Sequence, residues 1–112
     1  MSWRAAGFRA WLWQRVTAAY MAAFLVYFAL AAMVKQPDTY VAWKAWIGDG
    51  RWATALGLFF AALLLHSWVG VRDVLIDYVR PLPLRLSLLG FVALGLFAVG
   101  AWIFRSLLIA TL

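Results

Sequence analysis

The residues of this chain that are best suited to chemistry lie in one stretch, which runs from His66 to Tyr78. His66 is the only histidine and lies inside a long apolar run, and Asp77 and Tyr78 follow where that run ends. On a continuous helix, residues turn by about 100° and rise by about 1.5 Å, so Asp77 points within roughly 20° of His66 and lies about 16 Å further along. Asp73 lies about 20° to the other side. The stretch therefore predicts a polar stripe from mid-membrane to a membrane surface, which is the geometry of a binding site.

An ionisable side chain inside a spanning helix is costly to bury, so His66 is a functional candidate by default. Its imidazole suits the iron of a haem, and Ala62 and Gly70, one turn away on either side, are expected to leave room for a flat macrocycle. An imidazole that only hydrogen-bonds across helices would explain the residue equally well, and both interpretations stay open. A haem in a membrane bundle commonly has two histidine ligands, whereas this chain has one histidine. A haem site would therefore need its second ligand from another subunit.

Asp77 and Tyr78 together suit a quinone. A tyrosine hydroxyl at the interface can donate to a carbonyl oxygen while its ring packs against an apolar ligand. A neighbouring carboxylate can hold a water or a basic partner in position, and a quinone combines an apolar body with two carbonyl oxygens. Tyrosines are also common in the aromatic belt of membrane proteins, and the spacing alone favours that simpler interpretation.

The composition indicates a membrane protein. Of the 112 residues, 68% are hydrophobic, against about half in ordinary globular proteins. The absence of cysteine excludes a disulfide framework, a thiolate metal site and a haem attached through C-x-x-C-H. The net charge of +6 comes from basic residues at the ends of apolar runs, which act as membrane flanks and do not indicate nucleic-acid binding. No glycine-rich phosphate loop, catalytic triad or zinc-binding set indicates hydrolysis or phosphoryl transfer.

The apolar runs predict an all-α membrane protein with three transmembrane helices in a single domain. Each run is long enough to cross a hydrocarbon core of about 30 Å. The expected domain is 1–112, and the expected spans are 16–34, 52–71 and 86–104.

The segments outside the spans carry their own expectations. The second helix should continue past the membrane surface to about Arg80, because Pro81 lacks an N–H and disfavours helix in the residue before it. Residues 1–15 are interpreted as a retained interfacial segment with aromatic side chains. The loop 35–51 is expected to contain a short helix that lies in the interface.

The basic residues also predict an orientation. Six of them lie in the N-terminal tail and the loop 72–85, and four lie in the loop 35–51 and the C-terminal tail. The positive-inside rule therefore favours a cytoplasmic N-terminus and a C-terminus on the opposite side. Asp77, Tyr78 and Arg80 would then lie at the cytoplasmic face.

The polar stretch and its surroundings are similar to the motif of a known family. The segments that carry the likeness are His66-Ser67-Trp68-Val69-Gly70, then Asp77-Tyr78-Val79-Arg80-Pro81, then Leu84-Arg85-Leu86, and more weakly Arg15-Val16-Thr17-Ala18. With its three spans, the chain resembles the hydrophobic membrane anchor subunit of bacterial succinate dehydrogenase, the D-type subunit. That family has H-x-W-x-G, a helical step and D-Y-hydrophobic-basic-P at the same spacing. The likeness covers most of the chain, and Arg72-Asp73 is a more charged departure from it.

The resemblance implies one half of a six-helix anchor, in which this chain and a sister three-span subunit share one haem b. His66 matches the histidine that ligates the haem iron, opposite a histidine of the sister subunit. Tyr78 matches the tyrosine that hydrogen-bonds a ubiquinone carbonyl, and Asp77 matches the aspartate beside it. Arg15 matches an arginine near the quinone and the haem propionates.

The implied function is that of a subunit without catalytic activity of its own in succinate:ubiquinone oxidoreductase, respiratory complex II. An iron–sulfur subunit and a flavoprotein subunit would dock on the cytoplasmic face, and electrons would pass from the iron–sulfur protein to ubiquinone. The chain would span the bacterial cytoplasmic (inner) membrane among its lipids, with a periplasmic C-terminus. Two alternatives remain: the anchor of a fumarate reductase or another cytochrome b-type dehydrogenase, and a haem-free structural subunit or small transporter subunit.

Overall fold

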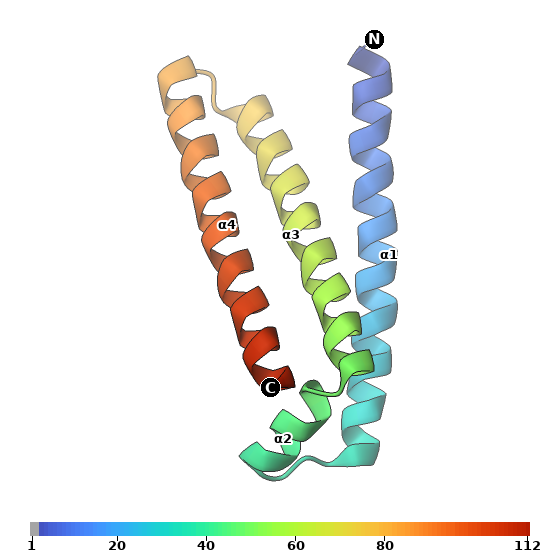
Figure 1. Cartoon of the computed structure of the whole chain (residues 1–112). Coiled ribbons are helices and arrows are strands. Elements are labelled where there is room, and N and C mark those ends of the chain that lie inside the picture. The colour runs from blue at the N-terminus through green and yellow to red at the C-terminus, as the bar shows by residue number, and fades with distance from the viewer. Residues whose placement is uncertain (1–2) are drawn as a thin grey trace.

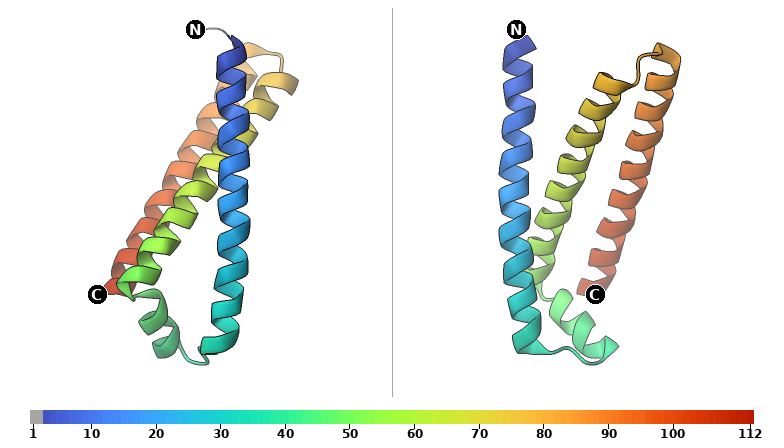
Figure 2. Two further views of the ribbon diagram at one scale, coloured as in Figure 1. Left: turned by 90° about the vertical axis from the view of Figure 1, so that its right-hand side faces the viewer. Right: turned by 180° about the vertical axis from the view of Figure 1, so that it is seen from behind.

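In the computed structural model, residues 3–112 are described, and they form three long helices and one short one. The helices are α1 (Trp3–Lys35), α2 (Tyr40–Ile47), α3 (Gly50–Tyr78) and α4 (Leu82–Thr111). The long helices lie side by side with α3 in the middle, and within the described residues the backbone of α1 does not come close to that of α4 (Figure 1). Figure 2 shows that α1 is inclined to the pair formed by α3 and α4. The N-terminal end of α1 and the α3–α4 turn lie at one end of the bundle, and α2 and the C-terminus lie at the other.

Most of the contact between α1 and α3 is made by one stripe of side chains on α1, to which Tyr27 adds a stacked contact with Trp52. Intervals of three and four residues place its members on one face of the helix. They are Gln14, Thr17, Met21, Phe24 and Phe28. Phe24, Leu56 and Phe59 form the buried centre of the seam, and the rings of Phe24 and Phe59 stack with centroids 4.9 Å apart. The seam is therefore apolar along most of its length and polar only towards the N-terminal part of α1.

The short helix α2 packs at the end of the bundle opposite the α3–α4 turn. Its Trp46 is buried, with ring centroids 4.9 Å from Phe28 and 5.1 Å from Trp52. Gly48 ends α2 and lies so close to the Ala110 carbonyl of α4 that no Cβ would fit there. Only glycine permits this approach of two backbones. The short helix expected between the first two spans is confirmed, and its place in a membrane interface stays a prediction.

The turn between α3 and α4 is shorter than the sequence predicted. The expected continuation of this helix beyond residue 71 is confirmed, and α3 ends at Tyr78, two residues before the expected Arg80, with Val79 extended at φ −100° and ψ 104°. A residue before proline avoids helical angles, and here the chain leaves the helix earlier still. α4 begins at Leu82 and not at residue 86, because Pro83 in the first turn removes an N–H that has no intrahelical acceptor.

The N-terminal segment belongs to the first long helix. α1 begins at Trp3 and runs without a break to Lys35, so the expected interfacial segment is, from Trp3 on, the first part of α1. Residues 1 and 2, and the side chains of residues 1–6, lie outside what the structure describes. The position of this segment at a membrane interface stays a prediction.

The three expected spans are confirmed as helices that are long and apolar enough to cross a membrane. Their candidate spanning parts are Gly7–Lys35, Gly50–Tyr78 and Leu82–Thr111. α4 contributes no buried residue within the described chain, and its Phe91 and Phe97 are 77% and 78% exposed. An apolar surface of this extent suits lipid or a neighbouring membrane subunit and not water. The chain is an all-helical, multi-pass membrane protein.

Candidate functional site

His66 lies in the seam between α3 and α1, where its imidazole meets Thr17. The Nδ1 atom of His66 is 3.0 Å from the Thr17 Oγ1 atom. Thr17 is buried, and its hydroxyl donates to the Trp13 carbonyl at 2.6 Å, one turn earlier in α1. Because the hydroxyl proton points at the backbone, the oxygen can accept a hydrogen bond from Nδ1–H. The cross-helix hydrogen bond expected of a structural histidine is therefore present, and it uses only one of the two ring nitrogens.

Gln14 is the second α1 side chain at His66. With its amide nitrogen towards α3, Gln14 donates to His66 Nδ1 at 2.8 Å and to the His66 carbonyl at 3.1 Å, and its oxygen accepts from Gly70 N–H at 3.2 Å. A neutral imidazole carries one N–H, so the two α1 partners select different tautomers. Thr17 accepts from Nδ1–H and leaves the lone pair on Nε2. Gln14 donates to a bare Nδ1 and places the proton on Nε2.

Gln14 lies close to Gly70 on the α1 side. A Cβ atom added at Gly70 would lie 2.9 Å from the terminal amide group of Gln14, which is closer than carbon atoms ordinarily come to such groups. The small residue lets α1 approach α3 closely enough for the amide to reach the α3 backbone. Gly70 also lines the recess beside His66, and the expectation that it leaves room for a macrocycle stays a prediction.

A recess of about 450 Å³ opens beside His66. It is lined by Gln14, His66, Ser67, Gly70, Val71, Val74 and Leu75. Within the described residues Nε2 of His66 takes no hydrogen bond. A neutral imidazole nitrogen is a common ligand of haem iron, and metal-bound histidines usually donate their other N–H to a fixed acceptor. The donor set therefore fits one axial ligand of a haem, with Thr17 as the acceptor that fixes the ring.

Asp77 and Tyr78 lie in the last turn of α3, on the same unbroken helix as His66. Both side chains are exposed, and Tyr78 is 79% exposed. The step of twelve residues from His66 to Tyr78 is about 18 Å along a helix axis, so the two side chains do not meet. His66 and Asp77 therefore lie along one unbroken helix, as predicted, and the end of the stripe at Asp77 and Tyr78 is exposed. A ligand at that end would need a further wall from another molecule.

Arg15 is not brought to His66 by this chain. Its side chain is exposed, and its guanidinium carbon lies 5.7 Å from the centroid of the Trp11 ring. By helical geometry Arg15 lies on another face of α1 than Gln14 and Thr17. Arg72 and Asp73 form an ion pair with each other, with Nη2 and Oδ1 3.2 Å apart and both side chains partly exposed. A pair between such neighbours contributes little to stability.

Comparison with known proteins assigns the chain to a family. The family model of the succinate dehydrogenase/fumarate reductase transmembrane subunit matches residues 1–104. The succinate dehydrogenase hydrophobic membrane anchor subunit of Coxiella burnetii (strain RSA 493 / Nine Mile phase I) is 30% identical over 104 residues, which cover 93% of this chain and 90% of that protein. The matched region includes every residue of the candidate site. The chain therefore belongs to the family of succinate dehydrogenase/fumarate reductase transmembrane subunits.

Proposed function

We propose that this chain is the hydrophobic anchor subunit of a succinate dehydrogenase, in which it holds part of a haem b site and part of a ubiquinone site. The observation that carries the proposal is the environment of His66, whose Nδ1 is bound to Thr17 at 3.0 Å beside an open recess. The family covers both succinate dehydrogenases and fumarate reductases. The name of the Coxiella burnetii relative favours the former, and the anchor of a fumarate reductase is the second candidate.

In this proposal His66 would hold the iron of haem b through Nε2. The haem, when bound, would supply a one-electron carrier inside the membrane. The chain's own contribution is positional: Thr17 accepts from Nδ1–H, fixes the plane of the imidazole and leaves the Nε2 lone pair available. The second ligand is proposed to be a histidine of a sister three-span subunit, since this chain has no other histidine.

Tyr78 and Asp77 are proposed to bind ubiquinone at the end of α3. The Tyr78 hydroxyl would donate to a quinone carbonyl, and Asp77 would hold a water or a basic side chain beside it. Support comes from their place in the last turn of a spanning helix and from the exposure of Tyr78, which leaves its hydroxyl accessible to a ligand from the membrane surface. Arg15 is proposed to lie near the same region in the assembled complex, because the N-terminal part of α1 and the end of α3 share one end of the bundle (Figure 1).

The partners proposed for the chain are the sister anchor subunit, the iron–sulfur subunit and the flavoprotein subunit of the complex. The exposed apolar face of α4 and the open recess at His66 are surfaces that a membrane partner would cover. The proposed location is the bacterial cytoplasmic membrane, with the N-terminus and the α3–α4 turn on the cytoplasmic side. Most of the basic residues lie at that end of the bundle, as the positive-inside rule requires.

The test is a reduced-minus-oxidised absorption spectrum of the complex that copurifies with this chain. We expect a b-type band that is lost or shifted to a high-spin form in His66→Ala. Ser67→Ala is the matched control, because Ser67 lines the same recess and supplies no iron ligand, and its band should equal that of wild type. A wild-type complex without a b-type band would refute the haem assignment. An unchanged band and haem content in His66→Ala would move the ligand to another residue.

A further inference from the structure

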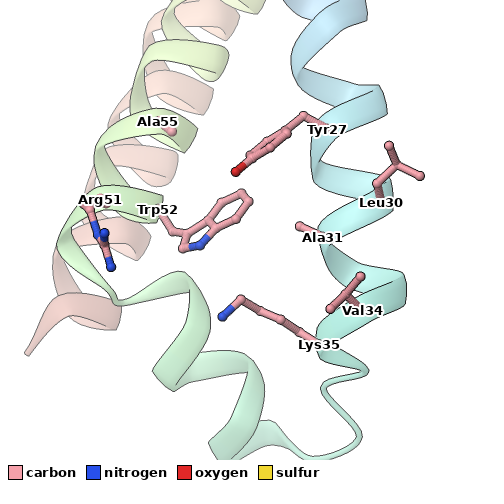
Figure 3. A pocket seen from close by; sticks show the side chains of 8 residues that line it. All are labelled: Tyr27, Leu30, Ala31, Val34, Lys35, Arg51, Trp52 and Ala55. Carbon is pink, nitrogen blue, oxygen red and sulfur yellow. The ribbon is translucent and has the colours of Figure 1, made fainter.

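A second recess lies at the opposite end of the bundle from Asp77 and Tyr78, between the end of α1 and the start of α3. It has a volume of about 690 Å³, within the range of roughly 300–1,000 Å³ that is usual for small-molecule sites. Its walls are apolar, and Figure 3 shows them: Tyr27, Ala31 and Val34 of α1 face Trp52 and Ala55 of α3. The Tyr27 and Trp52 rings are stacked, with centroids 5.6 Å apart. The site proposed above uses none of these residues.

Two cationic side chains, Lys35 and Arg51, lie at the open end of this recess, which we call its mouth. Lys35, the last residue of α1, and Arg51, in the first turn of α3, line it together (Figure 3). The Arg51 Nε atom lies 3.7 Å from Asp49 Oδ1, and the Arg51 side chain is 95% exposed, so this contact leaves most of the guanidinium open. Within the described residues Lys35 is in no ion pair. The mouth therefore carries a net positive charge above an apolar interior.

A buried donor adjoins the same mouth. Lys35, Arg51 and Trp52 also line a neighbouring recess of about 400 Å³, which Trp46 of α2 helps to form. Trp46 is 5% exposed, and its Nε1–H has no hydrogen-bond partner among the described residues. A buried N–H without an acceptor is costly. Because this atom has almost no accessible surface, it is the two cations and the apolar walls that favour an occupant.

We propose that this recess binds an anionic phospholipid, with the headgroup phosphate between Lys35 and Arg51 and an acyl chain along Tyr27, Ala31 and Trp52. Guanidinium and ammonium groups are the usual partners of phosphate oxygens. The helix ends place these cations where a membrane surface would lie, and the apolar walls continue from there towards the middle of the bundle. A neutral quinone would give Lys35 and Arg51 no anionic partner. A free phosphate ion would make no contact with the apolar interior. An anionic phospholipid satisfies both parts of the recess.

The experiment counts lipids on the purified complex by native mass spectrometry. The complex is delipidated in mild detergent and titrated with phosphatidylglycerol, or with phosphatidylethanolamine that has the same acyl chains. The double variant Lys35→Gln/Arg51→Gln is compared with Lys44→Gln/Arg105→Gln, which removes the same two kinds of charge at the same end of the bundle but outside both recesses. A cation near anionic lipid contributes about fivefold in affinity, so the first double variant should bind one phosphatidylglycerol about 25-fold more weakly. The control variant should bind it as wild type does.

Three results would overturn the proposal. The first is equal affinity of the wild-type complex for the two lipids, and the second is wild-type affinity for phosphatidylglycerol in Lys35→Gln/Arg51→Gln. The third is displacement of the bound species by inorganic phosphate alone, which would identify a site for a free anion. If the double variant does not assemble, the single variants Lys35→Gln and Arg51→Gln serve instead, each with an expected loss of about fivefold. The haem spectrum and the quinone activity are separate readouts, so failure here leaves the proposed function untouched.

Discussion

Replacement of Thr17 by valine tests whether the hydroxyl at His66 positions an iron ligand. Valine keeps the branched shape of threonine and removes the oxygen that lies 3.0 Å from His66 Nδ1. A haem-bound His66 must carry its proton on Nδ1, and the variant leaves this N–H without its acceptor in a buried seam. An unpaired buried donor costs about 1–3 kcal/mol, which corresponds to roughly five- to 150-fold in haem affinity. The haem reduction potential should also rise, because the imidazole becomes a weaker base without this hydrogen bond.

The assays are haem content per assembled complex, the rate of haem loss to an acceptor protein and a redox titration of the b-type band. Thr17→Ser keeps a hydroxyl and should restore most of the affinity and the potential. Thr54→Val is the matched control, because Thr54 donates to the Gly50 carbonyl at 2.7 Å on an exposed part of α3, away from His66. Assembly is followed by succinate oxidation with a dye that accepts electrons upstream of this chain.

The size of the loss in haem affinity expected for Thr17→Val depends on Gln14, because Gln14 also contacts His66 Nδ1. The Gln14 amide lies 2.8 Å from Nδ1 in the orientation that donates to it, and an amide turned by half a rotation would accept from Nδ1–H instead. Thr17→Val alone should therefore fall in the lower part of the range, and Thr17→Val/Gln14→Leu in the upper part. Wild-type haem affinity and potential in the double variant would refute the reasoning, since no α1 acceptor would then matter to the ligand.

Three further predictions concern the surroundings of this site. Tyr78→Phe should lower quinone-dependent turnover about five- to 100-fold if its hydroxyl donates to the quinone, with dye-linked succinate oxidation unchanged; an equal ratio of the two activities in variant and wild type would remove Tyr78 from the site. Gly70→Ala should displace Gln14, whose terminal amide group lies 2.9 Å from the new Cβ, and lower the midpoint of thermal inactivation. Gly90→Ala, with nothing within 4 Å, should leave the midpoint unchanged or raise it slightly. Arg15→Lys should reduce quinone activity because an ammonium does not replace the planar guanidinium, whereas full activity would leave Arg15 as a membrane flank.

The helices of this protein were predictable because their causes are local. Long apolar runs without charge indicate spans, and the prolines near residue 81 indicate a break in the chain. The boundaries were less predictable, since the first turn of a helix accepts proline and Pro83 therefore did not delay α4. The role of Gly48 was also hidden, because it depends on the carbonyl of Ala110, which lies far away in the sequence.

The sequence predicted which site residues lie along α3, but it did not predict which residues of α1 contact them. The periodicity of α3 placed His66 and Asp77 on one stripe, and α3 is indeed unbroken between them. The partners Thr17 and Gln14 were missed as site residues, because nothing local tells which face of α1 meets α3. One signal was present: both residues continue the three-and-four spacing of Met21, Phe24 and Phe28, so they share a face with the apolar seam.

The two α1 partners offer a hydrogen bond to His66 in either neutral tautomer, with or without the proposed haem. Without iron, Gln14 can donate to a bare Nδ1, and the proton on Nε2 points away from that contact. In the proposed haem complex, with iron on Nε2, the proton would lie on Nδ1, where Thr17 would accept it at 3.0 Å. α1 thus supplies one partner for each neutral tautomer, so His66 would have a hydrogen-bond partner on α1 both with and without the proposed haem.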